Sequence, residues 1–120
     1  MTEKTIYRIV TESELQEAKA TGRVPRNASD EASGFIHLSP YSEVLTTAQR
    51  YYTDYATLSV LEVSVEDLGP ELRWEPVSSR KNVHFPHLYA SNIPWAAVCQ
   101  VHTVKLDNGR FDWLSRKEGL

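Results

Sequence analysis

The sequence predicts one α+β domain, and three features of the chain support this prediction. Its 120 residues are 41% hydrophobic and include five Gly and six Pro, which is typical of a globular domain. Short β-branched segments outnumber helical ones, and the helical ones come early. The order strand, helix, strand, helix and four further strands does not alternate strictly, which disfavours a doubly wound parallel sheet. We therefore expect a single domain over residues 1–120, with its core at 5–114 and a flexible tail at 115–120.

The first strand and helix follow directly from local sequence signals. Thr5–Val10 is short and β-branched, so it predicts a strand. A helix is expected over Thr11–Thr21, because Thr11 and Glu14 can form a capping box at its start. Gly22 is well suited to end that helix in a left-handed conformation.

A second strand and a second helix follow. Gly34–Leu38 predicts a short strand, after which Ser39 can cap a helix whose first turn contains Pro40. Apolar residues at helical spacing indicate this helix: Val44, Leu45, Ala48 and Tyr52. The longest stretches without a regular pattern are 23–33 and 76–94, where we expect loops that build a site.

Strands alone are predicted for the second half of the chain. Leu58–Val65 is the clearest strand, and a turn at 67–70 ends it. Leu72–Glu75 is a short strand and Ala97–Leu106 a long one. The turn Asp-Asn-Gly at 107–109 then predicts a hairpin with a last strand at Arg110–Leu114.

Charge and composition exclude several classes of function. A net charge of −3 gives no broad positive field, so duplex nucleic acid is not an expected partner. The N-terminus lacks the apolar stretch of a signal peptide, and no apolar run could span a membrane, so we expect a cytoplasmic protein with no membrane partner. Cys99 is the only cysteine and lies in an apolar run, which predicts a buried, inert thiol.

Two polar residues in apolar strands are candidates for a site. Arg8 has apolar neighbours on its strand, so its charge must be paired or offered to an anionic ligand. An ion pair with Glu75 or Glu62 is the structural alternative. The two-residue repeat of a strand places His37 on the same face as Phe35, partly buried. Such a His can bind a ligand, act as a general base near neutral pH, or satisfy a buried carbonyl.

Further candidates lie in short polar segments. Glu75 follows a Trp at the end of a short strand, where apolar neighbours would raise the pKa of its carboxyl group, although surface carboxylates occupy such places too. Ser39 at a helix start could also face an anion such as phosphate. His84 and His87 could pair as metal ligands, but no third ligand follows at a diagnostic spacing, so no metal is expected. His102 is expected at a solvated strand position.

Several of these segments resemble one family when taken together. They are Ile6–Ile9, Gly34–Ser39, Trp74–Glu75 and Phe85–Tyr89, and in combination they resemble the small bacterial family known as domain of unknown function 952. The resemblance runs from Thr5 to about Trp113. It implies a fold similar to that of ADP-ribosyltransferases, a split β-sheet with two main helices in the N-terminal half and a cleft that holds NAD in active members. The family commonly has His, Glu and Gly where this chain has Arg8, Ser33 and Ala90.

The resemblance also implies roles for individual residues. His37 and Glu75 match catalytic positions, where a carboxylate would stabilise the ribosyl cation that forms as nicotinamide leaves NAD. Ligand-binding positions are matched by Arg8, Ser39, His87 and Tyr89. We therefore expect a nucleotide-type ligand, with NAD as the substrate of an ADP-ribosyl or related transfer. The alternatives are a binding module that keeps the cleft without the chemistry, and a structural or interaction protein in which these side chains only pack.

Overall fold

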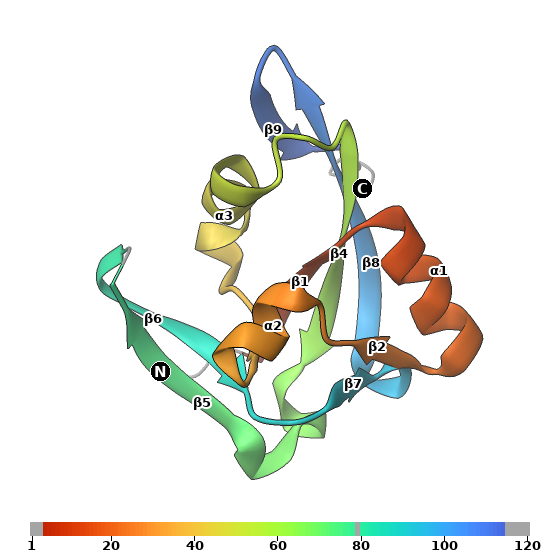
Figure 1. Ribbon diagram of the computed structural model, residues 1–120, viewed down its shortest axis with the longest axis vertical. Coiled ribbons are helices and arrows are strands. Elements are labelled where there is room, and N and C mark those ends of the chain that lie inside the picture. Colours follow the sequence, from red (N-terminus) through yellow and green to blue (C-terminus); the bar gives the residue numbers. More distant parts are fainter. Residues whose placement is uncertain (1–3, 79, 115–120) are drawn as a thin grey trace.

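The computed structural model describes residues 4–78 and 80–114, and within them it confirms the α+β class (Figure 1). The helices are α1 (Glu12–Thr21), α2 (Ala28–Ser33) and α3 (Val44–Tyr51). The strands are β1 (Thr5–Val10), β2 (Arg23–Pro25), β3 (Ile36–His37), β4 (Thr57–Ser64), β5 (Leu72–Val77), β6 (Arg80–Leu88), β7 (Asn92–Pro94), β8 (Val98–Asp107) and β9 (Arg110–Trp113). The predicted tail at 115–120 lies outside the described residues.

The described strands form three antiparallel sheets. The largest has the order β1-β4-β8-β9, a second has the order β3-β6-β5, and β2 pairs with β7. The backbones of Tyr7 and Ser39 join the first two sheets through a reciprocal pair of hydrogen bonds, with N–O distances of 2.9 and 2.8 Å. In Figure 1 the β5–β6 ribbon diverges from the β1–β4–β8 sheet, while α1 and α3 lie on opposite sides of that sheet.

Strands β1 and β4 of the four-stranded sheet are buried on both faces, which determines how polar residues on β1 are placed. Ile6 and Val10 pack with α1 in one apolar cluster, whereas Tyr7 and Ile9 pack with α3 in another. By the two-residue repeat of a strand, Arg8 belongs to the same face as Ile6 and Val10. Its guanidinium group therefore enters the interior, where a charge has to be paired.

Helix α2 and strands β2, β6 and β7 were not predicted from the sequence. The six residues of α2 include no large apolar side chain, so no helical spacing of apolar residues indicated it. Its start is nonetheless well specified, because Asn27 and Asp30 form a capping box. Gly34 ends α2 with a φ of 88°, a conformation that glycine adopts readily. In β6, Pro86 interrupts a pattern that would otherwise indicate a strand.

Two sequence predictions about single residues, for Ser39 and Cys99, are wrong. Pro40, not Ser39, occupies the N-cap of the 3-10 turn at Tyr41–Glu43, with no side-chain cap, because the backbone of Ser39 is bonded to β1. Cys99 is exposed, because it projects from the uncovered side of β8. His102 lies on strand β8 and is partly exposed, in agreement with the predicted solvated strand position, and its Nε2 lies 2.8 Å from Oε1 of Glu62.

No helix of the described residues has both the length and the apolar character needed to cross a membrane.

The cap of α2 gives a first testable prediction. Changing Asn27→Ala removes the side-chain oxygen that accepts the backbone N–H of Asp30 at 2.9 Å. We expect the free energy of unfolding to fall by about 1 kcal/mol, the usual cost of losing such a cap. Urea unfolding measures the change, with Ser33→Ala as the control at the exposed end of the same helix. Equal stabilities of the two variants would contradict a capping role for Asn27.

Candidate ligand-binding site

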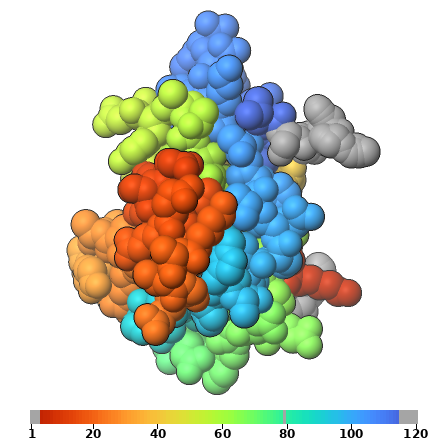
Figure 2. All heavy atoms as spheres, turned by 90° about the vertical axis from the view of Figure 1, so that its right-hand side faces the viewer, coloured from red at the N-terminus to blue at the C-terminus, as the bar shows by residue number. Residues whose placement is uncertain are grey.

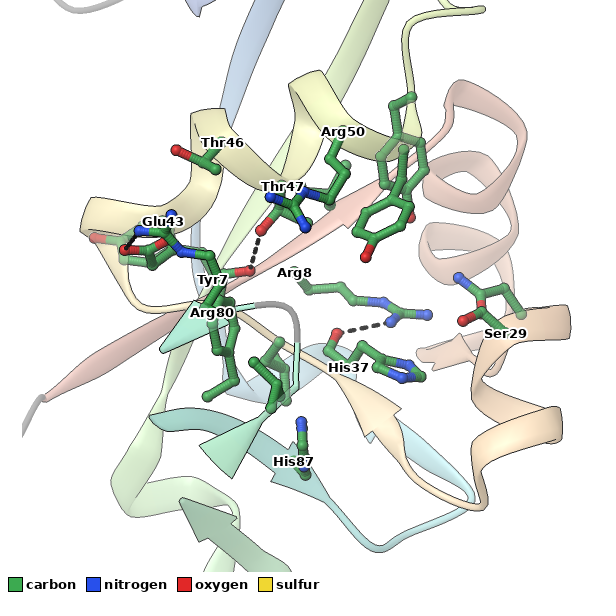
Figure 3. A pocket seen from close by; sticks show the side chains of 18 residues that line it. Tyr7, Arg8, Ser29, His37, Glu43, Thr46, Thr47, Arg50, Arg80 and His87 are labelled. Carbon is green, nitrogen blue, oxygen red and sulfur yellow. Dashed lines mark hydrogen bonds and ion pairs between the residues drawn. The ribbon is translucent and has the colours of Figure 1, made fainter. Parts of the chain in front are cut away.

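A pocket of about 470 Å³ lies between α3 and the strands β1, β3 and β6 (Figure 3). Its lining includes three arginines and two histidines: Arg8, Arg50, Arg80, His37 and His87. These residues come from β1, α3, β6 and β3, so only the folded chain brings them together. This is a strong local concentration of basic groups on a chain whose net charge is −3.

Arg8 is held in place by an ion pair with Asp30. Its Nη2 lies 2.6 Å from Oδ2 and its Nη1 3.2 Å from Oδ1 of that carboxylate, a two-point contact. Nη1 also donates to the backbone carbonyl of His37 at 2.8 Å. The prediction that Arg8 must be paired or bind an anion is thus met by a partner on α2, and neither Glu62 nor Glu75 contacts it.

Asp30 is the most fully engaged charged group at the site. Its side chain is 0% exposed, yet it accepts hydrogen bonds from Arg8, from the backbone of Asn27 and from the backbone and ring of His37. Burial alone would raise the pKa of Asp30, but the hydrogen bonds from His37 and Arg8 and the charge of Arg8 outweigh burial. The pKa of Asp30 is therefore held well below its usual range, and the carboxylate is ionised at neutral pH.

His37 extends from β3 beneath the guanidinium group of Arg8 (Figure 3). Its Nδ1 lies 2.8 Å from Oδ1 of Asp30, and its side chain is 39% exposed. Its ring also contacts Phe35 at a centroid distance of 4.7 Å, as expected for two residues on one face of a strand. An exposed ring edge next to the pocket leaves His37 able to contact a ligand.

His87 points from β6 toward the pocket (Figure 3), and its imidazole is hydrogen-bonded to Glu75, which lies outside the pocket. Its Nδ1 lies 2.7 Å from Oε1 of Glu75, and the same oxygen accepts the hydroxyl of Tyr89 at 2.8 Å. The hydrogen bonds from His87 and Tyr89 lower the pKa of Glu75, and the bond to Glu75 raises the pKa of Tyr89. Neither Glu75 nor Tyr89 lines the pocket, so both reach it only through His87.

Arg80 and Glu43 form a second ion pair at the pocket, with Nη2 of Arg80 3.0 Å from Oε2 of Glu43. Two buried atoms of this pair, Nε of Arg80 and Oε1 of Glu43, have no partner within residues 4–78 and 80–114, and the same is true of Nε of Arg8. Buried polar atoms normally have a hydrogen-bond partner. All three atoms belong to residues that line the pocket, so they are available to hydrogen-bond with water or with polar groups of a ligand.

Arg50 brings a further charge to the pocket from α3. Figure 3 shows its side chain reaching down past Thr47 toward the space above Arg8. No hydrogen bond or ion pair of the Arg50 guanidinium is found in the part of the chain that the structure describes. It is therefore the guanidinium group best placed to meet an anionic ligand.

The structure brings together four of the six predicted site residues at the pocket: Arg8, His37, Ser39 and His87. Sequence reasoning did not find Asp30, Glu43, Arg50, Arg80 or the packing role of Phe35. The spacing of Asn27 and Asp30 was a usable signal for α2, and hence for the carboxylate that holds Arg8 and His37. In the described residues, no group of three His, Cys, Asp or Glu side chains is placed to hold a metal ion.

Comparison with known proteins establishes the family. The family model described as "Protein of unknown function (DUF952)" matches residues 9–101, which is most of the chain. The chain belongs to this family. The match covers β1 from Ile9 onward, α2, β3, β5 and β6, and so it includes nearly all of the elements that build the pocket.

Solved structures of one other protein are similar to this chain over most of its length. The crystal structure of protein CC0527 from Caulobacter crescentus is similar with a TM-score of 0.80 and 38% sequence identity, covering 90% of this chain and 93% of that one. The solution NMR structure of CC0527 gives a TM-score of 0.76 at 36% identity, with 91% of each chain covered. No curated protein matches the sequence.

Proposed function

We propose that the pocket binds a nucleotide-type ligand through its phosphate groups. The observation that carries this proposal is the convergence of Arg50 and Arg80 with two imidazoles in a single pocket, on a chain that is acidic overall. Guanidinium groups recognise phosphate through paired hydrogen bonds. The pocket volume of about 470 Å³ is typical of sites for small molecules.

The remaining lining suits the non-phosphate part of such a ligand. Tyr51, Tyr52 and Phe85 provide aromatic surface in the same pocket, on which a base or nicotinamide ring can pack. Oε1 of Glu43, buried without a partner among the described residues, can accept a hydroxyl of a ribose. Basic, aromatic and hydroxyl-accepting groups in one pocket favour a nucleotide over a simple inorganic anion.

Transfer of the ADP-ribosyl group of NAD is the reaction that the resemblance to ADP-ribosyltransferases implies, and we propose it as the catalytic form of this function. The bond from ribose C1′ to the nicotinamide nitrogen breaks, nicotinamide leaves with the electron pair, and a carboxylate stabilises the cation that forms. An acceptor, which is water in the simplest case, then forms the new bond to C1′ with its lone pair and loses a proton to the solvent. Glu75 would act on this step only through His87, whereas Glu43 lines the pocket directly. The alternative is a module that binds the nucleotide without turnover.

Calorimetric titration tests the binding proposal. We expect NAD and ADP-ribose to bind and nicotinamide alone to bind more weakly, because nicotinamide lacks the phosphates. Changing Arg50→Ala should weaken the binding of ADP-ribose about tenfold, equivalent to about 1.4 kcal/mol for one lost guanidinium contact. Arg23→Ala is the matched control, since Arg23 is exposed and lies outside the pocket. Unchanged affinity in the Arg50→Ala protein would contradict phosphate recognition at this pocket.

Release of nicotinamide from NAD separates the catalytic form from the binding module. Nicotinamide formation that is lost in a Glu43→Gln or Glu75→Gln protein would support transfer. Binding without release would support the module.

A further inference from the structure

Both imidazoles of the pocket are held in the same way by a carboxylate. Nδ1 of His37 lies 2.8 Å from Asp30 and Nδ1 of His87 lies 2.7 Å from Glu75. Neither ring makes another hydrogen bond within the described residues. The Nε2 atom of each ring is therefore the one left for a ligand.

The carboxylates determine which nitrogen carries the proton. The low pKa of Asp30 and the lowered pKa of Glu75 keep both groups ionised at neutral pH, so both can only accept hydrogen bonds. Nδ1 must then be the donor in each ring. Nε2 is a proton acceptor while its ring is neutral and a donor once the ring is protonated.

The fold places these two rings side by side. His37 and His87 are directly paired across β3 and β6, which puts their side chains on one face of the sheet. Their ring centroids are 5.9 Å apart with an angle of 71° between the planes. Phe35, which does not line the pocket, stacks on His87 at 4.0 Å and contacts His37 at 4.7 Å. Packing and hydrogen bonding thus fix both rings at the edge of one pocket.

We propose that His37 and His87 form a general base and general acid pair that hydrolyses a nucleoside 2′,3′-cyclic phosphate. This proposal rests on the proposed function, because the substrate is a nucleotide whose phosphate is held by the same pocket. A phosphodiester needs two proton transfers, one from the attacking water and one to the departing oxygen, and two imidazoles can provide both. Arg50 and Arg80 would stabilise the charge that develops on the phosphate oxygens.

The reaction is balanced without a further reactant. Nε2 of His37, whose ring is the more exposed at 39% against 7% for His87, takes a proton from water as its oxygen bonds to phosphorus. The bond from phosphorus to one ribose oxygen breaks, and that oxygen keeps the electron pair. It receives a proton from Nε2 of the protonated His87. The product is a nucleoside monophosphate, and exchange with solvent restores both rings.

The groups around the pair would shape its pH dependence. The titratable and charged groups that face the two rings are Asp30 from α2, Arg8 from β1, Arg73 and Glu75 from β5, and Tyr89 after β6. Asp30 and Glu75 are negative and Arg8 and Arg73 positive at neutral pH, so these four charges balance, while Arg50 adds a further positive charge and Arg80 is paired with Glu43 at the same pocket. One ring must be neutral and the other protonated in the active form, which predicts a bell-shaped dependence of rate on pH.

The test is the hydrolysis of 2′,3′-cyclic AMP by the full chain, followed by chromatography of the products. We expect His37→Gln and His87→Gln each to lower the rate by about 100-fold or more. In each of these variants, the remaining rate should fall on only one side of the optimum pH, because only one of the two rings is left to titrate. His102→Gln is the matched control, because His102 is also held by a carboxylate but lies outside the pocket, and its rate should be unchanged.

Three outcomes would overturn the proposal. The first is binding of 2′,3′-cyclic AMP without hydrolysis, which leaves nucleotide binding intact. The second is the binding of neither 2′,3′-cyclic AMP nor ADP-ribose, which overturns the proposed function as well. The third is a wild-type rate that does not fall on both sides of an optimum pH, a readout that requires no variant to fold.

Discussion

We expect the change Arg8→Met to lower the free energy of unfolding by about 3–5 kcal/mol, because it leaves the carboxylate of Asp30 buried without its counterion. The side chains of Arg8 and Asp30 are 3% and 0% exposed, so water cannot replace the lost contacts. A domain of this size is stable by only about 5–15 kcal/mol, so the variant loses a large part of its stability. Urea unfolding at neutral pH measures the effect.

The control for this experiment is Arg23→Met. It removes the same charge from an exposed position on β2, where the cost should stay within about 0.5 kcal/mol. Similar losses in the two proteins would mean that the pair of Arg8 and Asp30 does not hold β1 against α2.

The second large effect is expected from Asp30→Asn, which removes the charge at the centre of the same network. At neutral pH this change should also cost about 3–5 kcal/mol, since Arg8 then remains buried without a carboxylate. The change should also alter how the free energy of unfolding depends on pH in the acid range. Because the pKa of Asp30 in the folded chain lies below its usual value of 3.8, its ionised form stabilises the folded state.

The lowered pKa of Asp30 determines how the stability of the folded chain changes with pH. Stabilisation by Asp30 is fully present above pH 3.8, the usual pKa value, and is lost as the pH falls from there toward the folded-state pKa. The wild-type chain should therefore lose stability on acidification more steeply than the Asp30→Asn protein. The urea midpoints of the two proteins should differ by a constant amount between about pH 7 and about pH 4 and approach each other as the pH falls further. Midpoint curves that remain parallel in the acid range would contradict the lowered pKa of Asp30. The control is Glu31→Gln, an exposed change on the same helix, which should leave the pH dependence of the wild-type protein unchanged.

Local signals were sufficient to predict the elements with strong periodicity or capping. The strand at Thr5–Val10, the helix capped by Thr11 and Glu14, and the Asn-Gly hairpin between β8 and β9 are present as expected. The start of α3 was shifted, because the backbone of Ser39 pairs with β1 instead of capping a helix. That pairing joins residues far apart in the sequence, and local preference carries no information about it.

In the candidate site, too, local sequence signals predicted some features, while others depend on contacts between residues far apart in the chain. A charge in the middle of β1 required a partner, and this much followed from the sequence. The identity of the partner depended on α2, a helix without an apolar stripe, whose Asp30 serves at once as part of the cap and as the counterion of Arg8. His87 and Glu75 were both chosen as site residues, but their contact depends on the register of β5 against β6. Arg50 and Arg80 lie among ordinary surface charges in the sequence and become distinctive only at the pocket.

Glu75 changes its expected role as a result. The carboxylate was expected to face a substrate, whereas in the structure its hydrogen bonds with His87 and Tyr89 are both made by one oxygen that does not line the pocket. It is best described as a positioning residue for the imidazole of His87. For both reactions proposed above, the ring of His87, which lines the pocket, is the group proposed to meet the ligand, and the carboxylate of Glu75 is not.

The most direct test of ligand binding at this pocket is a long-range ¹H–¹⁵N NMR spectrum of the histidine side chains, recorded while ADP-ribose is added. We predict that His37 and His87 carry their proton on Nδ1 in the free protein and that their Nε2 signals move on addition of ADP-ribose. The signals of His102, which lies outside the pocket, should stay in place. Nε2 signals of His37 and His87 that do not respond to saturating ADP-ribose, or that move no more than those of His102, would contradict the assignment of this pocket as a nucleotide site.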